Sequence, residues 1–231
     1  MKLYKLMKPD HTTRNEQKWE IGMRVEKAPC DNPRLCSEDV LHAYTNLNLA
    51  FMLAPLHGTG DYPVVAECEG DVVVSDWGKV GCIAITPVRW IDRPAWVWSG
   101  RDTQVRVAFA ALCAEAVIDI YNAEYPSEDA PRRAIMEAKA WLANPSIETA
   151  ARAVSAADAA SYAANSATYA ASYAASYAAD AASYAARAAS GRATSTRAVS
   201  LAARAVARAT DARTIDFTAL ADEAVRMVYD A

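Results

Sequence analysis

The sequence predicts an α+β N-terminal domain followed by an all-α, alanine-rich helical bundle, so that the chain is mostly helical overall. In residues 1–98, short runs of β-branched residues alternate with Gly, Pro and Asn turn chemistry, which is typical of strands. In residues 101–231 the apolar positions recur every three or four residues, and alanine, the strongest helix former, dominates. The predicted domains are therefore 1–98, a small α+β domain, and 101–231, an alanine-rich helical bundle.

Several strands are expected in the first domain. They cover residues 3–6, 19–25, 40–44, 64–68, 72–74 and 79–86, with 88–91 as an extension beyond Pro87. Asn46 is expected to cap a short helix that runs to Leu53, because a side-chain amide oxygen accepts from a free N–H of the first turn. The sequence Glu69-Gly70-Asp71 predicts a hairpin turn.

Five or more helices are expected in the second domain. The first is capped by Asp102 or Thr103 and reaches Ile120, and the second is capped by Ser127 or Asp129. Asn144-Pro145-Ser146 breaks the chain before the most alanine-rich stretch, which ends or bends at Gly191. Two more helices follow, over 194–211 and after a cap at Thr214 or Asp216.

Five tyrosines mark the alanine-rich stretch. They are Tyr162, Tyr169, Tyr173, Tyr177 and Tyr184. On one continuous helix, their spacings keep all five within about 40° of one line. The stretch is helical either as one piece or as two. Two roles stay open for the aromatic face: a core or interface contact, or a groove for a ligand or partner.

Candidate ligand-binding residues are these five tyrosines together with Arg187 and Arg132. Arg187 follows Tyr184 by three residues and begins a basic run, which continues with Arg192, Arg197, Arg204, Arg208 and Arg213. Arg132 and its neighbour Arg133 lie in the first turn of a helix, where a cation opposes the macrodipole. Either a local acid, Glu128 or Asp129, or an anionic ligand would compensate that charge. Asp158 and Asp180 read as exposed, solubilising charges.

The sequence contains no recognisable catalytic motif. His11, His42 and His57 lie far apart and form no metal-ligand spacing, so no metal and no cofactor are expected. The alternative is an enzyme that acts on a nucleotide through His42, Tyr44 and Glu67 on neighbouring strands.

Composition narrows the classes of partner. The net charge of −4 argues against bulk binding to nucleic acid. No stretch is apolar enough for a signal peptide or a membrane span, and the five cysteines include no C-x-x-C pair, so a cytoplasmic protein with free thiols is expected.

Residues 106–154 carry a local motif with Cys113-Ala114-Glu115, then Asp129, Pro131 and Arg132, then Trp141. This part resembles a family of alanine-rich helical immunity proteins, and the likeness extends loosely over 101–231. The N-terminal part resembles a small domain of unknown function common in phage and prophage proteins. That likeness rests on features such as Trp19 with Gly22 and the Leu41-His42-Ala43 run, and Tyr44 stands where the domain usually has cysteine.

These resemblances imply a mobile-element setting. Neither family carries an activity that could be transferred to this chain. The leading hypothesis is a non-enzymatic phage-type binding protein that neutralises a toxin or host-defence component. It would cover a protein, or sequester a nucleotide-like signal in a groove lined by Tyr and Arg. The alternatives are the nucleotide-processing enzyme and a structural protein in which the tyrosines form the seam of a homo-oligomer.

Overall fold

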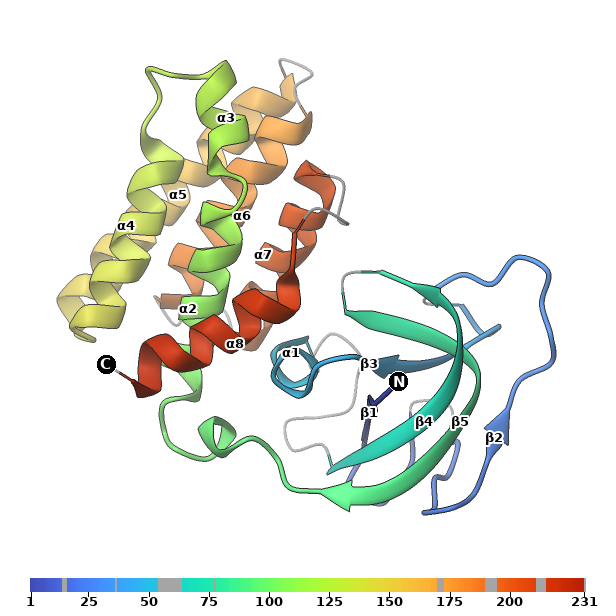
Figure 1. Cartoon of the computed structure of the whole chain (residues 1–231). Helices are drawn as coiled ribbons and strands as arrows, with labels where there is room; N and C mark the ends of the chain where they lie inside the picture. Colours follow the sequence, from blue (N-terminus) through green and yellow to red (C-terminus); the bar gives the residue numbers. More distant parts are fainter. Residues whose placement is uncertain are drawn as a thin grey trace. The chain divides into compact units, whose positions relative to one another are not determined.

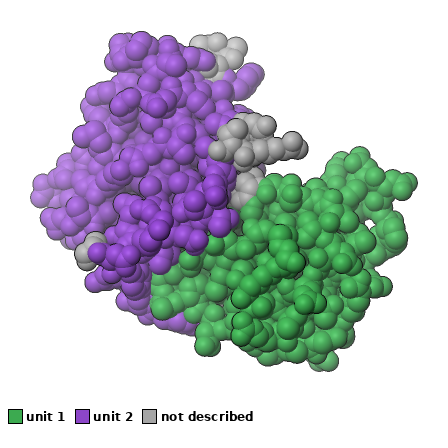
Figure 2. Space-filling model, in the orientation of Figure 1, with its two compact units in different colours: residues 1–97 green, residues 98–231 purple. Residues whose placement is uncertain are grey.

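The computed structural model describes residues 1–13, 16–35, 37–53, 64–76, 78–169, 173–189, 195–210 and 215–230, without the side chains of 169, 195–197, 199 and 200. The chain forms two compact units, Met1–Val97 and Trp98–Ala231, which Figure 2 distinguishes by colour. The first contains an antiparallel sheet and the second is helical, so the predicted fold class is confirmed.

The first unit is built on five antiparallel strands. They are β1 (Leu3–Met7), β2 (Val25–Glu26), β3 (Leu41–Tyr44), β4 (Val64–Ser75) and β5 (Lys79–Ile91). The strand order is β2-β5-β3-β1-β4, and β4 also pairs with β5, so four strands close into a small barrel. Figure 1 shows β4 and β5 as long, curved strands. Their curvature follows from register shifts, which include one beside Pro87, where the ladder lacks an N–H.

Two strand predictions need correction. The expected hairpin at Glu69-Gly70-Asp71 is wrong, because all three residues belong to the continuous strand β4. The turn instead lies before Lys79, where Gly78 has a φ of +116° that other residues rarely adopt. The expected strand over 19–25 is also wrong, since Gly22 turns the chain with a φ of +80° and only Val25 of this range pairs in the sheet. Asn46 caps α1 (Leu47–Leu53) as predicted, accepting from the Leu49 N–H at 2.8 Å.

Lys5 lies in the interior of the barrel. Leu3, Lys5 and Met7 alternate along β1 and therefore point to the same side, into a core that includes Trp19, Cys68 and Cys82. The Lys5 Nζ donates to the His42 carbonyl at 2.6 Å and lies 4.7 Å from the centroid of the Trp19 ring. Burial lowers the pKa of Lys5 to about 8, and the same effect raises the pKa values of the Cys68 and Cys82 thiols to about 12 and about 11.

The second unit is a bundle of helices. They are α2 (Asp102–Glu115), α3 (Ile118–Glu124), α4 (Ala130–Ala143), α5 (Ile147–Tyr169), α6 (Tyr173–Ala189), α7 (Ser195–Ala209) and α8 (Phe217–Tyr229). The helix α6 contacts α2, α3, α4, α5 and α7, and Figure 1 shows it within the bundle. Eleven of its residues are buried, nine of them alanines and two of them serines. Small side chains on a central helix let several neighbours approach its backbone closely.

Only some of the helix ends predicted from the sequence are confirmed in the second unit. Neither Asp102 nor Thr103 caps α2: the N-cap residue is Arg101, without a side-chain cap. The helix expected through Ile120 breaks at Ala116 and Val117 into α2 and α3. Asp129 is the N-cap residue of α4 but makes no capping hydrogen bond. For α8, Asp216 caps as expected, accepting from the Ala219 N–H at 2.9 Å.

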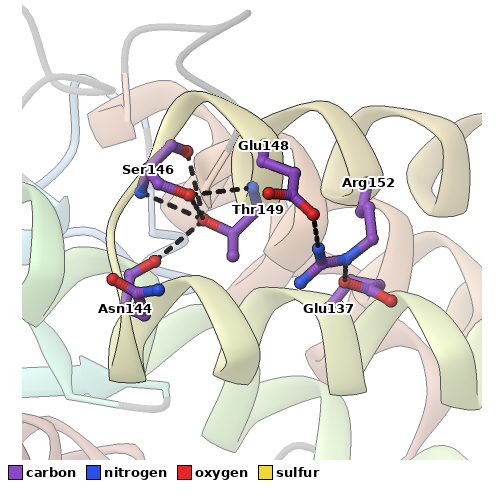
Figure 3. Close-up of polar contacts among 6 residues, drawn as sticks. All are labelled: Glu137, Asn144, Ser146, Glu148, Thr149 and Arg152. Carbon is purple, nitrogen blue, oxygen red and sulfur yellow. Dashed lines mark hydrogen bonds and ion pairs between the residues drawn. The ribbon is translucent and has the colours of Figure 1, made fainter.

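The start of α5 is held by a reciprocal cap, drawn in Figure 3. The Thr149 N–H donates to the Ser146 Oγ and the Ser146 N–H donates to the Thr149 Oγ1, each at 3.1 Å. One turn further, Arg152 forms ion pairs with Glu148 of its own helix and with Glu137 of α4. These contacts set the direction in which α5 leaves the break at Asn144-Pro145.

The replacement Lys5→Met tests the cost of the buried charge. With a pKa of about 8 in the barrel and an ordinary value of 10.5 when unfolded, Lys5 makes the wild-type free energy of unfolding rise between pH 8 and 10.5. The rise is about 3 kcal/mol. Chemical denaturation across this range should show the Lys5 contribution missing in the variant, which is more stable near pH 7. The thiols reduce stability at high pH in both proteins, so the difference between the two curves isolates Lys5. Parallel curves would contradict the assignment.

The replacement Ala179→Leu tests the close packing of α6. Ala179 is fully buried, so three added carbons must displace neighbouring helices, and we expect a loss of about 1–3 kcal/mol in the free energy of unfolding. Ala151→Leu is the matched control, because Ala151 is exposed on α5 and should change stability by less than about 0.5 kcal/mol. Equal urea midpoints for the two variants would show that the alanine face is not tightly packed.

Candidate binding surface

The tyrosines belong to two antiparallel helices. The Ser161 and Ser183 hydroxyls lie 2.7 Å apart, and those of Thr168 and Ser176 lie 2.5 Å apart. Because the position on α6 falls as the position on α5 rises, α5 and α6 form an antiparallel hairpin. The stretch therefore forms two helices rather than one, and the five tyrosines do not lie along the single line that a continuous helix would produce.

The Ser-Tyr dipeptides explain where the rings point. Ser161, Ser176 and Ser183 face the α5–α6 contact, and each precedes a tyrosine. One residue is about 100° around a helix, and in antiparallel partners the two rotations lead to the same side of the hairpin. Tyr162, Tyr177 and Tyr184 therefore emerge on one common side. The repeated Ser-Tyr pair in the sequence could have predicted this common side, whereas the spacing of the tyrosines alone could not.

Five accessible or partly accessible positions along one face of α6 form what we call the tyrosine stripe. It comprises Tyr173, Tyr177, Asp180, Tyr184 and Arg187. Their spacing of four, three, four and three residues keeps them on one face of α6. Tyr173 is 62% exposed and the other four are partly buried, whereas most positions between them are buried. The stripe is thus the outer face of the central helix.

Two of the five predicted tyrosines, Tyr162 and Tyr169, belong to α5. Tyr162 is 76% exposed, so neither it nor Tyr173 is a core residue. Tyr169 ends α5, and its side chain lies outside the described residues. The structure therefore groups Tyr162, Tyr173, Tyr177 and Tyr184 on the hairpin, with exposed or partly exposed rings.

Arg187 is held by the contact between α5 and α6. Its guanidinium donates to the Ser183 Oγ at 3.2 Å and to the Ser161 Oγ at 3.1 Å, and it lies 3.6 Å from an Asp158 carboxylate oxygen. Ser183 also donates to the Ala157 carbonyl. Arg187 therefore joins the helices at the end of the stripe, which limits its freedom to serve a ligand.

A second arginine of the basic run, Arg208, lies beside a ring of the tyrosine stripe. The Arg208 guanidinium of α7 lies 5.5 Å from the centroid of the Tyr177 ring, within the range of a cation–π contact. Arg204, one turn earlier on α7, is exposed like Arg208. Arg192 and Arg213, and the side chain of Arg197, lie outside the described residues.

Arg132 has a different neighbourhood. Its guanidinium lies 3.6 Å from an oxygen of Asp119 on α3, while Arg133 pairs with Asp129 at 3.1 Å. The expected compensation by Asp129 thus holds for Arg133, and for Arg132 the acid comes from a preceding helix. Within the described ranges we find no contact between Arg132 and the tyrosines.

The alternative catalytic residues lie on one face of the barrel but apart from one another. Tyr44 and Glu67 both pair with Tyr4 of β1, so a whole strand separates them, at roughly 10 Å. Hydrogen bonds from Lys2 and Arg89 lower the pKa of Glu67. Burial, reinforced by Lys79, Lys5 and Lys27, lowers the pKa of His42 to about 4. The separation of Tyr44 from Glu67 is too large for a direct hydrogen bond between these two side chains.

The described ranges contain neither a metal-binding cluster nor a helix that could span a membrane. No group of three His, Cys, Asp or Glu side chains there could hold a metal ion. No helix within them combines the length and the apolar character that a membrane span requires. The described cysteines Cys30, Cys68, Cys82 and Cys113 are free thiols.

The replacement Arg187→Met tests the structural role of this arginine. It keeps the aliphatic volume but removes the hydrogen bonds to Ser161 and Ser183, so we expect a loss of about 1–2 kcal/mol in the free energy of unfolding. Arg204→Met, at an exposed position of α7, should stay within about 0.5 kcal/mol of the parent. Urea denaturation measures both, and an unchanged Arg187 variant would leave the arginine available to a ligand.

Comparisons with known proteins assign no family. No family model, no curated protein and no solved structure matches the chain.

Proposed function

We propose that the protein is a non-enzymatic binding protein that neutralises a protein toxin or a host-defence component by covering it with the tyrosine stripe. The observation that carries the proposal is the outward position of the aromatic rings on a tightly packed helical hairpin. Tyr162 and Tyr173 are more than half exposed, at 76% and 62%. A hairpin that buries alanines while Tyr162 and Tyr173 stay accessible leaves a large aromatic contact area available to a partner.

Tyrosine and arginine suit such a contact. Both are enriched among the residues that dominate binding free energy at protein interfaces. A tyrosine offers a large apolar ring and a hydroxyl while it loses little conformational entropy on binding. The close packing of α6 keeps the backbone beneath the stripe in place, so binding need not order the surface first.

The biological setting comes from the sequence resemblances. The second unit resembles alanine-rich immunity proteins and the first a domain common in phage and prophage proteins. Both support neutralisation of a toxin or counter-defence as the purpose of binding, in the cytoplasm of the host cell.

A nucleotide-like ligand is the second candidate. The observation that favours it is Arg208 beside the Tyr177 ring, which places a cation for a phosphate next to a surface for a base. Asp180 lies three residues from Tyr177 on the same face and would repel a phosphate, so a protein partner fits the stripe better.

Site-specific cross-linking tests the proposal. A photoreactive phenylalanine analogue at position 173 should capture one defined protein in the producing cells, and the same analogue at exposed Tyr229 is the control. With that partner purified, Tyr177→Ala should weaken binding by about tenfold or more, while Tyr229→Ala changes it by less than about twofold. Equal affinity for parent and Tyr177→Ala would overturn the proposal. A nucleotide retained in native mass spectra of the parent, and lost from Tyr177→Ala, would favour the second candidate.

A further inference from the structure

Asp180 occupies the middle of the tyrosine stripe. It follows Tyr177 by three residues and precedes Tyr184 by four, so the three side chains lie within about 60° of one another around α6. Along the helix axis the carboxylate is about 5 Å from one ring position and about 6 Å from the other. The sequence pattern indicated an exposed, solubilising charge here, but Asp180 is partly buried.

No cation of the described chain neutralises Asp180 by contact. In the described ranges its carboxylate accepts no hydrogen bond and forms no ion pair. Arg187, seven residues further along the same face of α6, is held by Ser161, Ser183 and Asp158. Arg208 lies over the Tyr177 ring. Burial raises the pKa of Asp180, and the charge of Arg187 opposes that shift without removing it.

This arrangement favours a cation from outside. A carboxylate that has lost part of its hydration regains stability when an opposite charge comes within a few ångströms. The faces of tyrosine rings attract ammonium and guanidinium groups as well, and the attraction is stronger away from water. Two rings on either side of a carboxylate therefore make a small site whose charge and shape suit the end of an arginine or lysine side chain.

We propose that Asp180, between Tyr177 and Tyr184, receives an arginine or lysine side chain of the protein partner. The inference rests on the proposed function, because it assumes that the stripe is the covered surface. It gives that partner a stated chemistry: a basic residue at the centre of its contact surface. An arginine fits best, since its planar guanidinium can pair with the carboxylate and stack on a ring at once.

A peptide titration tests the site on the full-length protein. The probe is acetyl-Gly-Arg-Gly-amide, and its neutral counterpart carries citrulline, which keeps the shape but removes the charge. Amide NMR signals of residues 173–187 should shift saturably with the arginine peptide and at least about fivefold more weakly with the citrulline peptide. Asp180→Asn should weaken binding of the arginine peptide by about fivefold or more. Asp119→Asn, at an exposed aspartate of α3, should leave it unchanged.

Several outcomes would overturn the assignment. They are equal binding of the two peptides, unchanged binding to Asp180→Asn, or tighter binding of free spermidine than of the peptide, which would point to a polyamine instead. Because Asp180→Asn removes a partly buried charge at constant size, it should fold as the parent does, and its far-ultraviolet circular dichroism checks this.

The cross-linked partner separates this inference from the proposed function. Partner binding that is lost in Tyr177→Ala but kept in Asp180→Asn would overturn the role of Asp180 and support the stripe. Binding kept in both variants would overturn the proposed function and the inference that rests on it. Loss in both supports both.

Discussion

The contact of alanine faces around α6 is the constraint on which the helical unit depends. Methyl groups add little bulk, so α2, α4, α5 and α7 can all pack against one central helix. Such packing gains less hydrophobic free energy per residue than a leucine core, and close approach over many contacts offsets the difference. The alanine contacts fill the inner side of the α5–α6 hairpin, and Tyr162 and Tyr173 lie on its accessible side.

Polar groups give the alanine contacts a register. Alanine faces are nearly featureless, and one face could slide along another with little change in packing. The hydroxyl pair of Ser161 and Ser183, with Arg187 bound to both, is satisfied at one alignment of α5 and α6 only. A polar network in a small-residue interface thus specifies alignment more than it adds stability. The same serines direct the following tyrosines outward, which links the fold to the candidate surface.

The two units place their unusual charges differently. Lys5 lies inside the barrel, where it donates to a backbone carbonyl and faces Trp19. Its burial is compatible with a structural role, because the groups around it are all supplied by the barrel. Asp180 lies at a surface and lacks such groups among the described residues. The barrel thus supplies the partners of Lys5, whereas the described residues supply no contact partner for Asp180, which is the basis of the proposed contact with a cation from outside.

The fold class follows from the amino-acid sequence alone, because propensity and periodicity act locally: alanine and the three-to-four spacing specify helices, and alternating β-branched residues specify strands. The sequence also determined caps such as Asn46 and Asp216, whose side chains bond three residues away. The hairpin that carries the tyrosines depends on tertiary contacts, since the folding of α6 back onto α5 is a long-range event. Tertiary contacts also account for the burial of Lys5, the partial burial of Asp180 and the contact between Arg208 and Tyr177. Burial and contact depend on which helices and strands meet, and chain spacing does not encode that directly.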